Sequence, residues 1–134
     1  MKFTIPGEPV PKLRPRVYRK GGMRVFTPQK TLDYEAKVRL MAQAAGLRPL
    51  DGPLCLTVEF VHRLPKGQER KRKPVTEYRL KPTKPDLDNL VKALMDGLEG
   101  VAFESDSQVV VIHALKWWGR QGEDGHTDVE IEDA

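Results

Sequence analysis

The chain has 134 residues, of which 39% are hydrophobic and 31% are charged, and its formal net charge is +4. This length suffices for one domain with its own core, and the single cysteine excludes an intramolecular disulfide. No apolar run is long enough to cross a bilayer, and the N-terminus lacks the apolar stretch of a secretory leader. We therefore expect a single domain over residues 1–134, located in the cytoplasm and without a membrane partner.

The charge is distributed unevenly along the chain. Residues 1–85 hold 20 Lys/Arg and 7 Asp/Glu, a net of +13, whereas residues 86–134 hold 3 and 12, a net of −9. Such asymmetry predicts a surface that binds a polyanion, next to a separate acidic feature. The alternative is that basic loops and an acidic C-terminal strand only keep the protein soluble.

The N-terminal quarter of the chain predicts one strand and one basic segment. Residues 2–5 (KFTI) read as a short strand that Pro6 closes. Residues 9–24 are rich in proline, glycine and basic side chains, and their prolines predict an irregular, exposed and mobile segment. Residues 24–26 (RVF) predict a brief strand after it.

The middle of the chain predicts a helix, a strand and a second basic segment. The helix begins at Thr27, which can cap it, and runs to about Ala45. Residues 54–62 (LCLTVEFVH) alternate between apolar and other side chains, as in a half-buried strand. Residues 63–85 hold nine basic residues and four prolines, which predicts a second mobile loop.

The C-terminal part predicts a helix and two further strands. Leucines at helical spacing mark a helix over residues 88–98, and the β-branched run at 108–118 predicts a central strand covered on both faces. Residues 126–132 alternate apolar and acidic side chains, as a strand with one wet face does. The order of elements predicts an α+β domain with one mixed β-sheet and two main helices.

Two aspartates stand one residue apart where the second helix begins, in KPDLDNLVKALMDGLEG. Asp88 can cap the helix, and Asp86 can be a loop acid neutralised by Lys84. Two unit charges 4 Å apart repel by about 4 kcal/mol at an effective dielectric of 20. A divalent cation between the carboxylates would convert this repulsion into attraction, and carboxylate oxygens are the ligands that Mg²⁺ prefers.

Two more residues extend this pattern. Asp106 lies in FESDSQV, in the turn before the strand at 108–118, and the topology can return that turn to the start of the helix. Lys92 follows Asp88 by one helical turn on the same face. A metal at a phosphodiester can activate water and stabilise the developing charge, so these residue types point to phosphoryl chemistry.

The string KPDLDNLVKALMDGL, followed by DSQV, resembles the RusA family of Holliday-junction endodeoxyribonucleases. PVPKLRPRV, FTPQKTLDYE and LPKGQERKRK are similar to further motifs of its phage and prophage branch, so the resemblance covers nearly the whole chain. It implies a RusA-like fold and a homodimer that nicks four-way DNA junctions in pairs, in DNA recombination and repair. The implied cofactor is Mg²⁺, with Mn²⁺ as a substitute, and no nucleotide cofactor is expected.

The resemblance also assigns roles to single residues. It implies that Asp86, Asp88 and Asp106 are metal-binding acids and that Lys92 contacts the scissile phosphate or steadies the developing charge. Relatives often carry two acids in a row before the glutamine, whereas this chain has a serine followed by Asp106, so Glu104 is the reserve ligand. The residues expected to neutralise DNA phosphates are Lys12, Arg14, Arg16, Arg19, Lys20, Arg70, Lys71, Arg72, Lys73 and Lys84.

Two alternatives remain open at this point. The first is a non-catalytic protein that binds branched DNA, in which Asp88 is a helix cap and Asp106 a turn residue. The second is a partner-binding protein whose basic loop meets an acidic protein. The sequence leaves open the number of metal ions, the cleavage-sequence preference, the natural branched substrate and the dimer interface.

Overall fold

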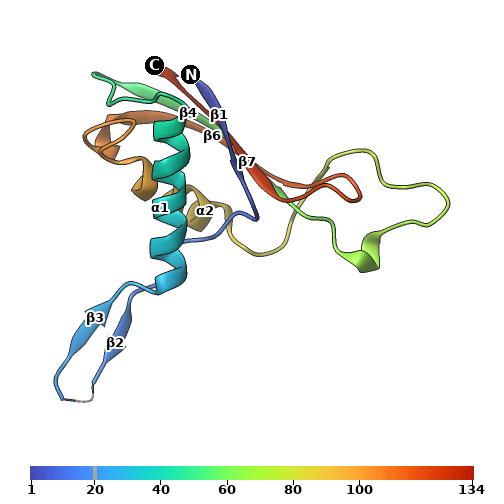
Figure 1. Cartoon of the computed structure of the whole chain (residues 1–134), viewed down its shortest axis with the longest axis horizontal. Helices are drawn as coiled ribbons and strands as arrows, with labels where there is room; N and C mark the ends of the chain where they lie inside the picture. The colour runs from blue at the N-terminus through green and yellow to red at the C-terminus, as the bar shows by residue number, and fades with distance from the viewer. Residues whose placement is uncertain (20) are drawn as a thin grey trace.

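A mixed β-sheet forms the frame of the fold in this computed structural model, which describes residues 1–19 and 21–134. The sheet has five strands in the order β1-β7-β4-β6-β5 (Figure 1). Strands β4 and β6 are parallel, and the other neighbours are antiparallel. The strands are β1 (Lys2–Pro6), β4 (Leu54–His62), β5 (Arg79–Leu80), β6 (Val109–Trp118) and β7 (His126–Asp133).

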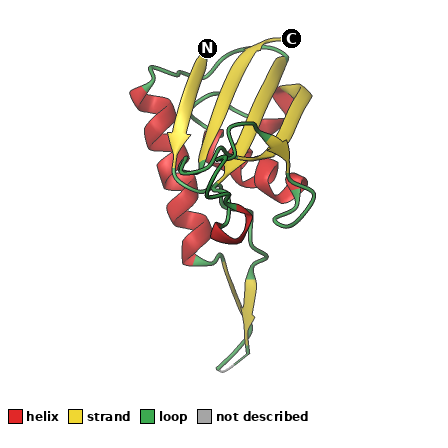
Figure 2. Cartoon of the chain, turned by 90° about the vertical axis from the view of Figure 1, so that its right-hand side faces the viewer, coloured by secondary structure: helices red, strands yellow, loops and turns green. Residues whose placement is uncertain are grey.

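Two helices, α1 (Gln29–Ala44) and α2 (Leu87–Leu98), lie on the same face of this sheet (Figures 1 and 2). The predicted α+β architecture with one mixed sheet and two main helices is therefore confirmed. No helix of the described residues combines the length and the apolar character that a membrane span needs.

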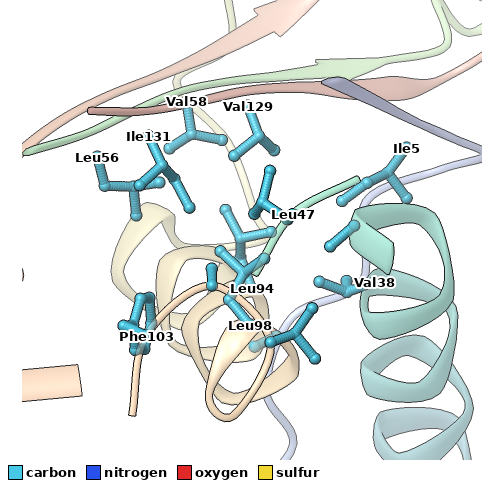
Figure 3. Close-up of a cluster of buried hydrophobic side chains, with 14 of the residues drawn as sticks. Ile5, Val38, Leu47, Leu56, Val58, Leu94, Leu98, Phe103, Val129 and Ile131 are labelled. Atoms are coloured by element: carbon cyan, nitrogen blue, oxygen red, sulfur yellow. The ribbon is translucent and has the colours of Figure 1, made fainter. Parts of the chain in front are cut away.

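The core lies between the sheet and the helices (Figure 3). Alternate residues of β4 point into it, and α2 adds Leu90, Leu94 and Leu98, all fully buried. Burying such a side chain stabilises the fold by about 1.5–3 kcal/mol. The leucine spacing of α2 thus fixes which side of the helix faces the core, and its polar side is left to face solvent.

The two helices approach each other closely at Gly97. A Cβ atom built there would lie 2.7 Å from the Val38 Cβ atom of α1 and 3.1 Å from the Glu35 carbonyl oxygen. Only a residue without a side chain fits this contact, so Gly97 sets how closely α2 is held against α1.

The N-terminal basic segment is more regular than its prolines predict. Strand β2 (Arg16–Tyr18) pairs with β3 (Arg24–Phe26) in an antiparallel hairpin that projects away from the sheet (Figure 1). The prolines all precede β2, and Gly21 and Gly22 adopt positive φ angles of 79° and 119° in the connection. The expectation of an irregular segment over residues 9–24 is therefore wrong for the residues of β2, because pairing begins after the last proline.

The helix boundaries differ from the sequence prediction by one or two residues. Pro28 is the N-cap of α1 and no side chain caps it, so the predicted capping by Thr27 is not found. Gly46, with a φ of +87°, follows the end of the helix. In α2 the N-cap is Asp86 rather than Asp88, which lies inside the first turn.

Strand β6 departs most from its prediction. The apolar run predicted a central strand covered on both faces, but β5 pairs only with Trp117 and Trp118, at the end of β6. Along the rest of its length, β6 pairs on one side with β4. Val110, Ile112 and Leu115 are 60%, 43% and 42% exposed, so the prediction of a strand covered on both faces is wrong. Its β-branched composition suits a strand in the interior, but the short β5 leaves most of its outer edge uncovered in the single chain.

Candidate functional site

The start of α2 presents two aspartates to solvent. Asp86 stands at the N-cap with extended backbone angles, and its side chain makes no capping hydrogen bond. The Oδ1 atom of Asp88 accepts a hydrogen bond of 2.9 Å from the backbone nitrogen of Asn89. Both residues are exposed, and acids in a first helical turn interact favourably with the helix dipole. The capping role that the alternative assigns to Asp88 is not found.

Asp106 lies in a short 3₁₀ turn, Asp106–Gln108, whose shape is fixed by its neighbours. The Gln108 Oε1 atom accepts hydrogen bonds from the backbone nitrogens of Glu104 and Ser105, and its Nε2 atom donates to the Leu50 carbonyl at 2.8 Å. The glutamine of the DSQV motif therefore ties the turn to the loop before β4. Its place in the motif is visible in the sequence, but this contact depends on a residue more than 50 positions away.

Lys92 connects the turn to α2. Its Nζ atom lies 4.0 Å from the Asp106 Oδ2 atom and 3.0 Å from the Asp96 Oδ1 atom, one turn further along the helix. The structure thus brings Asp106 to the polar face of α2 at Lys92, whereas its predicted place beside Asp86 and Asp88 stays a prediction. Hydrogen bonding to Asp96 raises the pKa of Lys92 more than burial lowers it, which keeps the ammonium charged at neutral pH.

Asp96 also binds a lysine from the N-terminal segment. Its Oδ2 atom lies 3.0 Å from the Lys12 Nζ atom, which in turn lies 2.8 Å from the Glu35 Oε1 atom of α1. Burial lowers the pKa of Lys12, but the hydrogen bonds to Glu35 and Asp96 outweigh it and raise the pKa on balance. The Lys12 backbone nitrogen donates to the Asn89 carbonyl at 2.9 Å. The basic segment is thereby attached to α2 beside the acids.

The metal-binding role stays a prediction. Among residues 1–19 and 21–134, no three His, Cys, Asp or Glu side chains lie close enough together to hold a metal ion. The donor chemistry of the first two aspartates nevertheless suits Mg²⁺, because Asp86 and Asp88 are exposed carboxylates at the start of α2. Asp106 contacts Lys92 further along the helix, so a site that includes all three acids would require side-chain rearrangement.

The predicted phosphate-binding residues divide into two groups. Arg14, Arg19, Arg70, Lys71, Arg72, Lys73 and Lys84 are exposed. Lys12 is instead engaged by two carboxylates, so phosphate binding by its ammonium would require these contacts to break. Lys20 and the side chain of Arg16 lie outside the part of the chain that the structure describes.

The second basic segment is attached to the body of the protein by Gln121. The Gln121 Oε1 atom accepts hydrogen bonds from the backbone nitrogens of Arg70 and Val75, and its Nε2 atom donates to the Arg70 carbonyl. Between these anchors the side chains of residues 71–73 are exposed, and the segment projects from the sheet (Figure 1). The mobility predicted for residues 63–85 stays a prediction.

The fold and the site together define an α+β domain with two exposed aspartates at a helix N-terminus and two basic segments that project from the body of the protein. Residues 6–132 match the family described as Endodeoxyribonuclease RusA. The chain belongs to this family of endodeoxyribonucleases. It is also similar to the protein YqaN of Bacillus subtilis (strain 168), described as uncharacterized, with 33% identity over 129 residues that cover 90% of this chain and 89% of YqaN.

Proposed function

We propose that this protein is a Mg²⁺-dependent, structure-selective endodeoxyribonuclease that resolves four-way DNA junctions by paired symmetric nicks. The observation that carries the proposal is that Asp86 and Asp88 stand exposed at the start of α2 while Lys92 of the same helix contacts Asp106, in a chain of the RusA family. We assign the activity to DNA recombination and repair, in a phage or prophage setting.

Asp86, Asp88 and Asp106 would hold the metal ion, with Glu104 as a further acid beside them. When bound, Mg²⁺ or Mn²⁺ supplies charge stabilisation at the phosphodiester and lowers the pKa of a bound water. Lys92 reaches the same place from α2, and its raised pKa keeps a positive charge there for the scissile phosphate. Asp96 holds this ammonium at 3.0 Å until a phosphate competes for it.

The exposed bases of the two projecting segments would bind the arms of the junction. These bases would recognise DNA independently of its sequence, because phosphates carry no base information. Selectivity for a four-way junction would then come from where the two segments stand relative to the acids.

Paired nicks require two sites, and the uncovered edge of β6 supports a homodimer. An exposed apolar strand edge invites pairing with another strand, and a two-fold axis makes such pairing self-complementary. Because β5 covers the end of β6, such an antiparallel pair would use residues 109–115, with the two-fold axis near Ile112.

The dimer is tested by light scattering at several protein concentrations. Ile112→Lys places a charge on the exposed edge and should yield monomers, whereas Leu40→Lys, at an exposed apolar position of α1, should leave the dimer intact. A dimer that persists in Ile112→Lys, or a wild-type protein that is monomeric throughout, would contradict this part of the proposal.

A non-catalytic protein that binds branched DNA is the second candidate. The observation in its favour is that, in the described part of the chain, no three potential ligands are close enough together to hold a metal. The two functions differ in one assay: a labelled synthetic four-way junction and a linear duplex of the same sequence, each incubated with Mg²⁺ or with EDTA. Symmetric nicks on the junction that EDTA abolishes support the nuclease, and bound but intact strands support the second candidate.

A further inference from the structure

Two lysines of the sheet edge converge on the three residues that precede Asp86. Lys81 follows β5, Lys116 belongs to β6, and the Lys81 backbone nitrogen donates to the Lys116 carbonyl at 3.0 Å. Both side chains extend towards the segment Thr83–Pro85, which leads into α2. Neither lysine is one of the proposed metal-binding or catalytic residues, and Lys81 lies in the second basic segment but is buried, unlike its exposed bases.

The contacts of the two ammonium groups are with oxygen atoms of this segment. The Lys116 Nζ atom donates to the Thr83 and Pro85 carbonyls, both at 2.7 Å. The Lys81 Nζ atom donates to the Thr83 carbonyl at 3.2 Å, to the Thr83 Oγ1 atom at 3.0 Å and to the Lys84 carbonyl. Three consecutive carbonyl oxygens are therefore held by two positive charges.

The burial of Lys81 shows that it is not an ordinary surface lysine. The residue is only 6% exposed, and its Nζ atom lies 4.6 Å from the centre of a Trp118 ring. Burial, followed by repulsion from Lys116, lowers its pKa in spite of the attraction of Glu8. A buried ammonium is costly unless its three N–H groups find acceptors, and the oxygens of this segment supply them.

These contacts bear directly on the position of Asp86. The carbonyl before Asp86 belongs to Pro85 and is held by Lys116, while the Asp86 carbonyl accepts a hydrogen bond of 3.2 Å from the Leu90 nitrogen. The position of Asp88 is fixed because this residue lies in the first turn of α2. The position of Asp86, at the N-cap, also depends on the loop that precedes the helix. The lysine contacts therefore fix the peptide units immediately before Asp86, which the hydrogen bonds of α2 do not reach.

We propose that Lys81 and Lys116 are positioning residues that fix the backbone of Thr83–Pro85 and so hold the Asp86 carboxylate beside Asp88, ready for a divalent cation. This inference rests on the metal dependence proposed above. The two lysines would touch neither the metal nor the DNA, but they would order the backbone before a residue that binds the metal.

The test measures binding of Mn²⁺ to the DNA-free protein by electron paramagnetic resonance of the free ion. Lys116→Met keeps the length of the side chain but removes its hydrogen-bond donors, and we expect Mn²⁺ affinity to fall by about 10- to 100-fold. Lys116→Arg restores donors and should recover part of that affinity. Lys30→Met, an exposed lysine of α1, is the matched control and should bind Mn²⁺ as the wild type does.

A second measurement separates positioning from phosphate binding. Junction affinity is determined in EDTA as a function of salt, and positioning predicts that Lys116→Met keeps the wild-type affinity and salt slope. A slope reduced by about 0.9, with unchanged Mn²⁺ affinity, would make Lys116 a phosphate-binding residue and overturn the inference. Thermal unfolding of each variant establishes that it is folded before either titration is compared.

The outcomes also separate this inference from the proposed function. If the wild type binds Mn²⁺ and cuts junctions while Lys116→Met binds Mn²⁺ equally well, the positioning role fails and the nuclease stands. If the wild type binds no Mn²⁺ at all, the metal dependence fails and the inference fails with it.

Discussion

The acids and the bases of this protein are held in different ways. Asp88, Lys92 and Asp96 project from a helix whose opposite side is packed into the core, and Asp106 lies in a turn that Gln108 ties to a distant loop. The exposed bases stand on a hairpin and a loop that project from the sheet (Figure 1). The difference matches the tasks proposed for them, because chemistry needs fixed geometry whereas phosphate binding tolerates adjustment.

Removing an acid should have the largest effect. In Asp86→Asn and Asp88→Asn, we expect the rate of junction cleavage to fall by about 100-fold or more, because each variant lacks a charge that acts on the transition state. Junction affinity in EDTA should stay at the wild-type value. Asp33→Asn, at an exposed position of α1, is the control and should cut normally. Normal cutting by both variants would remove these two acids from the site.

The basic loop should behave in the opposite way. Replacing all four residues 70–73 by glutamine should weaken junction binding by about 10- to 100-fold and flatten the log–log salt slope by about 0.9 for each phosphate that is no longer neutralised. Cleavage at saturating protein should change little. The double variant Arg39→Gln, Arg48→Gln removes bases outside the two projecting segments and serves as the control. An unchanged salt slope would mean that the loop does not touch phosphate.

The rigidity of the acidic side can be tested through the contact between the helices. Gly97→Ala forces a methyl group to within 2.7 Å of Val38, so we expect the free energy of unfolding to fall by about 1–3 kcal/mol. Gly67→Ala makes the same substitution at a position where an added Cβ atom would meet nothing within 4 Å, and it should leave the stability unchanged. Urea titration measures both. Equal stability of the two variants would show that α1 and α2 can separate at little cost.

The smallest expected effect comes from Asp96→Asn, which leaves Lys12 and Lys92 without their shared carboxylate. The Asp96 side chain is 18% exposed, and we expect the free energy of unfolding at pH 7 to fall by about 1–2 kcal/mol. Burial would raise the pKa of Asp96, but the hydrogen bonds from Lys92 and Lys12 outweigh it and lower the pKa below 3.8.

The pH dependence of that effect follows from the direction of each shift. Because the pKa of Asp96 is lowered on folding, its stabilisation is present above about pH 4 and disappears as the pH falls through the lowered pKa. Because the pKa values of Lys12 and Lys92 are raised above 10.5, the stabilisation persists until the pH exceeds that value. Melting curves of the wild type and Asp96→Asn should therefore differ between about pH 5 and 10 and converge as the pH falls through the lowered pKa of Asp96.

Local patterns predicted the elements that carry the acids. The leucine spacing placed α2 to within one residue, and the alternation at residues 54–62 predicted β4 over its full length. Both patterns reflect burial on one face, which the sequence records directly. The aspartates and Lys92 could be placed at the start of α2 for the same reason.

Non-local contacts account for what the sequence did not predict. The apolar run of β6 is typical of a covered strand, but the length of β5 decides how much of its edge is covered. Lys12 looked like its basic neighbours, and only the fold brings Glu35 and Asp96 to it. No sequence pattern predicted the contacts of Lys81 and Lys116, because the partners of these lysines are mainly backbone carbonyls.

The most direct test of the nuclease proposal is the cleavage of a supercoiled plasmid that extrudes a cruciform, with Mg²⁺ and with EDTA. Two coupled nicks at the cruciform convert the plasmid directly into a linear form, so we predict linear product at the cruciform from the earliest times, and none with EDTA or with Asp88→Asn. Accumulation of open circles nicked at random, or an intact plasmid under conditions where the protein is bound, would contradict the assignment of this acidic site to junction resolution.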